Sequence, residues 1–584
     1  RRVTVKSPRT MRVSVILLSV LIVGWVLPTQ AQNERSTGPI VSESVRHSTS
    51  VPFRDMVREP RAPFEGESRD INPLGRMPKV SRSGLSMGSE RMPPPYPPDL
   101  APAPLMSFNG IGNTGWAPPD TVGDVGPNHY VQAVNTDYAV FNKATGALVL
   151  GPFNVNDIWS GAGGKCESQN DGDPIILYDS TNDRWMISQF YIFGFGPNSE
   201  HGECIAVSTT GDPTGSWHRY EFFWSQEILN DYPHFGIWPD GLYMAANQFD
   251  MSAGGTWAGQ GVAAFEWEEM LKGNAATMVK FDLFTTNPDY GAQIPAVWDG
   301  AASPPPAGRP ALFIEWEDQD WYNPPLPSDE LWVWEFHVDW DNPGNSTFGN
   351  NLDYDYTVAT IDVDPTFCPG NRECLPQPPY DNPPFGLQDS PLLEPVAPRL
   401  MHRLAYRNMG SHEVIVGSHT VDADGTDRAG ILWFELRDPF GTPFMQQDSV
   451  FDPDDGENRW MGSIAMDKNG NIALGYSVSS LTTHPSIRYT GRLATDPLGT
   501  MRAEQEAFDG AGSQTGTSRW GDYSSMNVDP VDDLTFWYTQ EYYETTSSRA
   551  WDTGIVSFAF DAAEVVFSDG FESGDTTSWS SSTP

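Results

Sequence analysis

A unit of short apolar strands separated by tight turns recurs seven times, and this repeat constrains the fold more than any other feature. Each unit opens with a short strand that ends in a turn, and a second, more apolar strand follows. Successive units start 53, 58, 62, 108, 58 and 60 residues apart. Repeats of this length and strand content are typical of propeller blades, which are antiparallel sheets. The units start at Asp120, Asp173, Asp231, Gln293, Met401, Arg459 and Arg519.

The repeat predicts an all-β fold, a seven-bladed β-propeller over residues 104–561, with a six-bladed ring as the alternative. The long fourth interval holds a Pro- and Cys-rich insertion near residues 362–398, which we expect to form a loop on one face. The last unit has no obvious fourth strand, whereas a spare strand at Pro104–Phe108 precedes the first unit. We therefore expect this spare strand to complete the last blade and close the ring. An array of sandwich domains would need units of about 100 residues. The spacing between successive units disfavours this alternative.

The residues outside the repeats form four further segments. A positively charged start, an apolar run and a small-residue exit predict a signal peptide over residues 11–31. This segment predicts an exported protein, secreted or at the cell surface, with no stable membrane insertion once the signal is removed. The others are expected to be upstream translated sequence (1–10), a Pro- and Ser-rich flexible linker or propeptide (32–103) and a Gly-, Ser- and Asp-rich tail (562–584).

The chain is strongly acidic, and its charge narrows the choice of partners. It has 77 Asp and Glu against 35 Lys and Arg, which gives a net charge of −42. A polyanion of this size repels nucleic acid and anionic membranes, so neither is an expected partner. An extracellular glycan or protein remains as the expected partner. Acidity of this kind can equally serve solubility alone.

Four cysteines fit an oxidising compartment and predict disulfides. Four cysteines allow three pairings, and we favour the pairing of nearest neighbours, Cys166 with Cys204 and Cys368 with Cys374. The second pair would close a short Pro-containing loop. A zinc site is disfavoured, because the sequence has no Cys-x-x-Cys pair.

Several stretches resemble a group of secreted bacterial β-propeller proteins of unassigned function. The similar stretches include PPDTVGDVGPNHYVQAVN from Pro118, GSIAMDKNGNIALGYSVSS from Gly462 and RWGDYSSMNVDPVDDLTFWYTQEYY from Arg519. The resemblance covers residues 105–560 and implies the fold and export, but it brings no catalytic residues. More distantly, one turn resembles the structural Asp box of sialidases, at Ser208, Asp212, Gly215 and Trp217.

The first strand of each propeller blade lines the central channel, so the residues at the start of these strands should meet at one mouth. Carboxylates there could act as an acid/base pair or collect a hard cation such as calcium, and arginines could hold an acidic ligand. We expect no organic cofactor. The alternative is structural, because such residues also pin neighbouring blades together. The candidate ligand-binding residues are Asp120, Asp173, Asp231, His234, His402, Arg403, Arg459, Trp460, Arg519, Trp520, Asp522 and Tyr523.

Two weaker motifs have ordinary structural explanations. The stretch Asp422–Asp427 resembles the start of a calcium loop, but Trp433 stands where such a loop needs a glutamate, so a hairpin turn is favoured. Tyr538 and Glu541 resemble the Tyr–Glu nucleophile pair of sialidases, but a tyrosine on a strand is more often a packing residue. The sequence contains no signature of a serine hydrolase, a zincin or a nucleotide-binding enzyme.

Two functions therefore stay open. The first is a binding module that recognises an extracellular glycan or protein at the channel mouth and the loops. The second is an extracellular sialidase-like glycoside hydrolase or polysaccharide lyase. Channel geometry distinguishes them: a hydrolase needs two carboxyl groups about 5–10 Å apart beside an open pocket, whereas acids paired to neighbouring blades favour binding.

Overall fold

The computed structural model describes residues 37–56, 69–70, 99–194, 196–300, 302–322, 324–364, 373–382 and 386–560. The chain divides into two compact units, Arg1–Arg35 and Ser36–Pro584, and all described residues belong to the second. The predicted signal peptide, the segment before it and the tail from residue 562 lie outside the described residues, as does Cys368.

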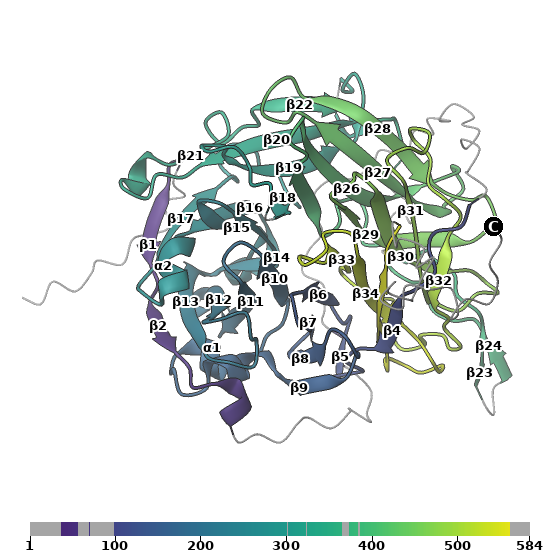
Figure 1. Cartoon of the computed structure of the whole chain (residues 1–584), viewed down its shortest axis with the longest axis horizontal. Coiled ribbons are helices and arrows are strands. Elements are labelled where there is room, and N and C mark those ends of the chain that lie inside the picture. Colours follow the sequence, from purple (N-terminus) through teal and green to yellow (C-terminus); the bar gives the residue numbers. More distant parts are fainter. Residues whose placement is uncertain are drawn as a thin grey trace, which may run out of the picture. The chain divides into compact units, whose positions relative to one another are not determined.

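The described chain is all-β (Figure 1). Within each sheet, most strands pair antiparallel with the strand that follows them in the sequence, and short turns join such strands. Alternation of apolar and polar residues between Gly-, Asp- and Asn-containing turns produces this pattern. The first sheet contains β6 (Val122–Val125), β7 (His129–Val134), β8 (Asp137–Asn142) and β9 (Leu148–Asn154). The second contains β10 (Ile175–Asp179), β11 (Arg184–Phe193), β12 (Glu200–Ser208) and β13 (Trp217–Gln226), with β2 (Arg46–Thr49) at its edge. The third contains β14 (Ile228–Trp238), β15 (Gly241–Asp250), β16 (Thr256–Phe265) and β17 (Thr277–Asp282), with β1 (Ile40–Glu43) at its edge.

The fourth and fifth units share one nine-stranded sheet, because β18 pairs in parallel with β25. Its strands are β18 (Ile294–Asp299), β19 (Ala311–Glu317), β20 (Glu330–His337), β21 (Thr347–Phe348), β22 (Tyr356–Ala359), β25 (Leu404–Asn408), β26 (Glu413–Asp422), β27 (Ala429–Arg437) and β28 (Phe444–Phe451). Two four-stranded sheets follow, composed of β29 (Asn458–Met466), β30 (Ile472–Ser479), β31 (Ser486–Arg492) and β32 (Gln505–Phe508), and of β33 (Ser525–Val528), β34 (Phe536–Tyr542), β35 (Asp552–Phe558) and β4 (Met106–Asn109).

Short elements connect or flank these sheets. Two small pairs are β3 (Arg69–Asp70) with β5 (Trp116–Ala117), and β23 (Tyr380–Asn382) with β24 (Gly386–Gln388). The helices are α1 (Lys165–Ser168), α2 (Trp267–Lys272) and the 3-10 turns η1 (Phe53–Asp55), η2 (Val155–Trp159), η3 (Gly196–Asn198), η4 (Met251–Ala253), η5 (Gln319–Trp321) and η6 (Pro343–Asn345). Among the described residues, no helix has the length and apolar character needed to cross a bilayer.

The first strands of the successive units contact one another in a closed cycle. β6 contacts β10, and contacts continue through β14, β18, β25, β29 and β33 back to β6. Figure 1 shows β6, β10, β14, β18, β29 and β33 around the middle of the picture, with later strands of the sheets farther out. This arrangement is consistent with a propeller. The count of seven blades stays a prediction, since two units share one continuous sheet.

The spare strand before the first unit completes the last sheet, as the sequence predicts. β4 pairs antiparallel with β35, with Phe108 opposite Ile555. This pairing joins two residues that lie 447 positions apart in the chain.

The flexible-linker prediction is wrong for residues 37–56. There β1 pairs antiparallel with β17 and β2 with β13, so this segment adds an edge strand to two sheets. Phe53 follows these strands, is buried and stacks on Trp217 with ring centroids 5.7 Å apart. The two strands are short and lack a strong apolar alternation, and they form because open sheet edges supply their backbone partners.

The core lies between the sheets and is rich in aromatic side chains. Neighbouring sheets approach closely where glycine faces an aromatic ring: a Cβ added at Gly475 would lie 2.6 Å from the Tyr538 ring. The predicted Cys166–Cys204 disulfide is confirmed, and it ties α1 to β12 of the second sheet. Cys374 is also disulfide-bonded, and its predicted partner lies outside the described residues.

Candidate ligand-binding centre

The candidate residues stand at the starts of first strands, where the repeat places them. Asp120 precedes β6, Asp173 precedes β10 and Asp522 precedes β33, while His234 lies on β14 and His402 precedes β25. Because the first strands form a closed cycle, these positions from separate units come close together. The residues that the structure brings into one group, here called the central cluster, are Asp120, Asp173, Asp231, Tyr232, His234, His402, Arg519, Asp522 and Tyr523.

Acidic groups occupy one side of the central cluster. The carboxyl groups of Asp120 and Asp173 form a hydrogen bond with each other. Burial raises the pKa of Asp120 well above its usual value, and the nearby charges of Asp173 and Asp522 raise it further. Two carboxyl groups this close share a proton more readily than they carry two charges. Burial also raises the pKa of Asp173 well above its usual value, so the pair holds a shared proton at neutral pH.

Other bonds fix the acidic side in place. Asp173 Oδ2 accepts from the backbone N–H of Tyr232 at 3.2 Å, and the Tyr232 hydroxyl donates to the carbonyl of Asp522 at 2.9 Å. Arg519 forms ion pairs with Asp522 at 2.5 Å and with Glu394 at 3.1 Å. These bonds join elements from the second, third and last units, so the cluster also holds the units together.

Four aromatic rings also belong to the central cluster. His234 and His402 stack with centroids 5.4 Å apart, and Tyr523 lies 5.6 Å from His234 and 6.1 Å from His402. Tyr232 meets His234 edge-on at 4.5 Å. The Tyr523 hydroxyl donates to the carbonyl of Pro174 at 3.1 Å.

The two histidines are buried without hydrogen bonds. Each is only 1% exposed, and none of their four ring nitrogens has a hydrogen-bond partner among the described residues. Burial lowers the pKa of His234 to about 3, with a further contribution from the positive charge of Arg399. Burial likewise lowers the pKa of His402 well below its usual value, and His234 and Arg403 act in the same direction. Both imidazoles are therefore neutral at neutral pH.

Two of the arginines predicted to bind ligand form contacts outside the central cluster instead. Arg403 forms an ion pair with Asp299 of β18 and donates to the carbonyl of Met526 at 3.2 Å. Arg459 is fully buried and pairs with Asp455 at 2.7 Å and Glu504 at 2.8 Å. The Arg403 bonds join separate units, as in the structural alternative, whereas Arg459 pairs with the turn before its own strand and with its own unit.

The predicted tryptophans pack against each other. Trp460 and Trp520 are fully buried, with ring centroids 5.7 Å apart. The Trp520 indole donates to Ser477 Oγ at 3.0 Å. Their environment is that of core residues between the last two sheets.

Sequence reasoning missed three charged residues beside the cluster. Glu394 pairs with Arg519, and the Arg399 guanidinium lies 4.8 Å from the centre of the Tyr232 ring. Glu394 belongs to the end of the insertion and Arg399 follows it directly, and the lack of a strand pattern in this stretch hid both residues. Glu203 is fully buried on β12, and burial followed by the charge of Asp173 raises its pKa well above its usual value. The sequence signal that could have identified Glu203 is a glutamate next to the apolar residues of β12.

The remaining motifs act structurally. In the sialidase-like turn, Asp212 Oδ1 accepts from the Thr214 backbone at 2.9 Å, and the Trp217 indole donates to Pro213 at 3.0 Å. Asp422 accepts backbone N–H groups within the hairpin between β26 and β27. Tyr538 donates to Ser524 Oγ at 3.1 Å, and Glu541 accepts from the Gly521 N–H at 2.8 Å.

The described residues contain no group of three or more His, Cys, Asp or Glu side chains placed to hold a metal ion. Calcium at the mouth, and ligand binding by any of the candidate residues, stay predictions.

Comparison with known proteins gives only distant similarities. No family model and no curated protein sequence matches this chain. Among solved structures, an ulvan lyase, which is a polysaccharide lyase, matches with a TM-score of 0.32 and 11% identity over 79% of this chain and 94% of its own. The extracellular domains 1–2 of Drosophila Semaphorin 1a match with a TM-score of 0.33 and 10% identity over 80% and 90% of the two chains. A Trypanosoma rangeli sialidase in complex with sialic acid matches with a TM-score of 0.31 and 10% identity over 66% and 53%. Similarities at this level assign no function to this chain.

Proposed function

We propose that this chain is an exported β-propeller that binds an extracellular glycan or protein at its channel mouth and the surrounding loops. One observation carries the proposal. His234 and His402 have four buried ring nitrogens without partners among the described residues. Their rings contact Tyr232 and Tyr523, which lie near the carboxyl groups of Asp120 and Asp522. Buried polar atoms left without hydrogen bonds are costly, so such atoms commonly mark where water or a ligand binds.

The chemistry of these groups favours a ligand rich in hydroxyl groups. A neutral imidazole offers one donor and one acceptor. The acidic side supplies further acceptors, and Tyr232 and Tyr523 supply apolar ring surface. A sugar presents the same combination, since its hydroxyls both donate and accept. Among the proposed partners, a glycan therefore fits the central cluster better than an extended peptide.

The arrangement of the acids favours binding over hydrolysis. Asp120 and Asp173 bond directly to each other, whereas glycosidase carboxyl groups stand about 5 Å apart or more. Arg519, Arg403 and Arg459 are all engaged in ion pairs with neighbouring segments. A carboxyl pair without room for a sugar carbon or a water between its members lacks the geometry of the alternative, a sialidase-like hydrolase.

We further propose that the propeller has seven blades. Besides the closed cycle of seven first strands, the same unusual backbone conformation recurs at the start of the units. Residues other than glycine adopt a positive φ only rarely, so its recurrence at matching places supports one repeated turn. The residues are Asp120 (49°), Asp173 (50°), Tyr232 (53°), Ala292 (56°), Met461 (56°) and Asp522 (61°).

Export is proposed from two independent features. The sequence predicts a signal peptide over residues 11–31, and the structure contains a disulfide between Cys166 and Cys204. Disulfides persist in oxidising compartments, so this bond is compatible with an extracellular protein.

A glycan panel tests the proposed function. The mature protein is scored for binding and for cleavage, with and without chelator, alongside Asp173→Asn, His402→Gln and the control Asp533→Asn. Asp533 pairs with Arg407 outside the central cluster. We expect a glycan that binds without cleavage and loses at least about tenfold in affinity in both cluster variants, but not in the control. Cleavage that chelator does not affect would favour the hydrolase, and equal binding by all variants would move the site to the loops.

Arg519→Ala is a poor probe of this site. Arg519 is 8% exposed and carries two ion pairs, so its removal takes this cation away from the buried Glu394 and the half-buried Asp522. Breaking a buried pair in this way typically costs about 3–5 kcal/mol of stability, which would hide any effect on binding.

A further inference from the structure

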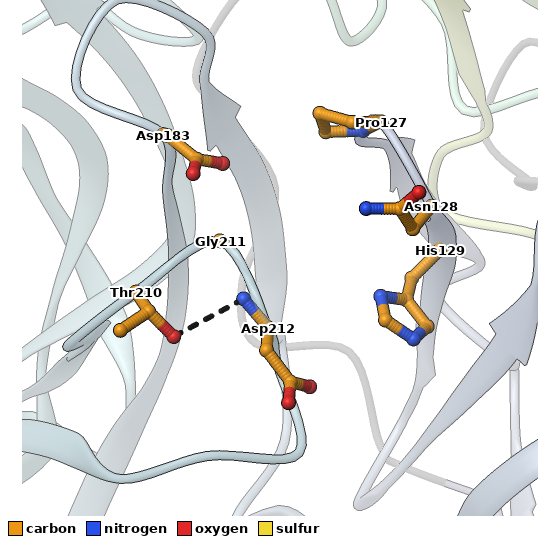
Figure 2. A pocket seen from close by; sticks show the side chains of 7 residues that line it. All are labelled: Pro127, Asn128, His129, Asp183, Thr210, Gly211 and Asp212. Carbon is orange, nitrogen blue, oxygen red and sulfur yellow. Dashed lines mark hydrogen bonds between the residues drawn. The ribbon is translucent and has the colours of Figure 1, made fainter.

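A cavity lies between the first and second sheets, away from the central cluster. It has a volume of about 330 Å³, which is within the range of small-ligand pockets. Three turns line it, at the opposite end of β6 and β10 from Asp120 and Asp173. Figure 2 shows the turn after β6 on one side and the turns after β10 and β12 on the other. The lining residues are Pro127, Asn128, His129, Asp183, Thr210, Gly211 and Asp212.

The two carboxylates of this cavity differ in their partners. Asp212 forms an ion pair with Arg54 at 2.8 Å and caps its own turn through Thr214. Asp183 accepts a hydrogen bond from the Tyr178 hydroxyl at 2.6 Å, but no basic side chain among the described residues pairs with it. A Cβ added at Gly211 would lie 1.9 Å from Asp183 Oδ1, so glycine is what lets the carboxylate lie against this turn. Both carboxylates lie at the protein surface, and at Asp183 the cavity keeps one negative charge that no cation of the described residues pairs with.

His129 faces these acids from the other side of the cavity (Figure 2). Its Nδ1 atom is buried and has no hydrogen-bond partner among the described residues. Burial lowers the pKa of His129, although the charge of Asp212 acts in the opposite direction. The ring is therefore neutral at neutral pH, and with its proton on Nε2 the Nδ1 atom is an acceptor.

We propose that this cavity binds a primary ammonium group carried by a small polar molecule, such as an amino sugar or a lysine side chain. An ammonium group has three N–H donors and one positive charge. The cavity offers Asp183, Asp212 and the His129 Nδ1 atom as three acceptors, and its excess of one negative charge matches the cation. The amide of Asn128 and the hydroxyl of Thr210 supply polar contacts for the rest of the molecule. This site is independent of the function proposed for the central cluster.

Saturation-transfer NMR with the mature protein at neutral pH tests the proposal, using glucosamine, lysine amide and N-acetylglucosamine as probes. We expect glucosamine, lysine amide or both to bind, and the acetylated sugar, which has no ammonium group, not to bind. Whichever amine binds identifies the source of the ammonium group. Binding of N-acetylglucosamine as strong as that of glucosamine, or no amine binding at concentrations up to about 50 mM, would overturn the proposal.

Asp183→Asn is the decisive variant, because it removes the charge and keeps an acceptor for Tyr178. Its matched control is Asp240→Asn: Asp240 stands in the corresponding turn of the third sheet, accepts from the Tyr243 hydroxyl at 2.9 Å and does not line the cavity. We expect amine affinity to fall at least about tenfold in Asp183→Asn and to stay unchanged in the control. His129→Phe removes the third acceptor and should also weaken binding. Unchanged affinity in a folded Asp183→Asn protein would refute the proposed site.

Discussion

Replacing His234 by glutamine should remove one measurable part of the acid sensitivity of this protein. His234 is 1% exposed, stacks on His402 and has no hydrogen-bond partner for either ring nitrogen among the described residues. Charging this imidazole requires either unfolding or a costly buried cation. Glutamine has a similar size, stays neutral at every pH and therefore isolates the contribution of the titrating ring.

The expected magnitude follows from the pKa of His234. A fall from 6.5 to about 3 on folding corresponds to about 5 kcal/mol between the two protonation states. Because the folded pKa is lowered, the unfolded chain binds the proton first, and stability is full above pH 6.5 and falls as the pH drops toward 3. Between pH of about 8 and about 5, the contribution of His234 alone is about 2 kcal/mol. The variant should lack this part of the loss.

Urea unfolding, followed by tryptophan fluorescence at several pH values, measures the effect. The decisive quantity is the change in unfolding free energy between the two pH values, since the substitution can also shift stability equally at all pH values. His337→Gln is the control: the hydrogen bond that His337 donates to Glu335 raises the pKa of His337, so its contribution to stability is lost as the pH rises and has the opposite sign. Identical pH dependence of His234→Gln and the wild-type protein would refute a buried, neutral His234.

Three further predictions concern the N-terminal segment of the chain and its disulfide bonds. A protein that starts at residue 95 loses β1 and β2 from two sheet edges, whereas one that starts at residue 112 also loses β4, which completes the last sheet. Calorimetry should show a modest drop in Tm for the first protein and a much larger drop for the second. Equal Tm values for the two proteins would contradict the closure of the last sheet by β4. Replacing both Cys166 and Cys204 by alanine should lower the unfolding free energy by about 4 kcal/mol for a loop of 38 residues. Intact mass after alkylation, with and without reductant, should count four cysteines in disulfides, and four free thiols would exclude both predicted bonds.

Local sequence patterns were sufficient to predict the strands and the closing strand. β4 could be placed on β35 because the repeat lacked one strand at its end and had one to spare at its beginning. The edge strands β1 and β2 could not be predicted, since their stability comes from backbone partners on β17 and β13 rather than from their own side chains.

The sequence by itself determined that polar residues at the starts of the first strands would gather near one axis, because the period of the repeat sets where each strand begins. Only the tertiary structure decided which of them remain in the central cluster. Arg403 and Arg459 turn away to Asp299 and to Glu504. The insertion supplies Glu394 to Arg519. The physical reason is that strand and turn preferences act over a few neighbouring residues, whereas a buried charge takes whichever partner the packed units bring within reach.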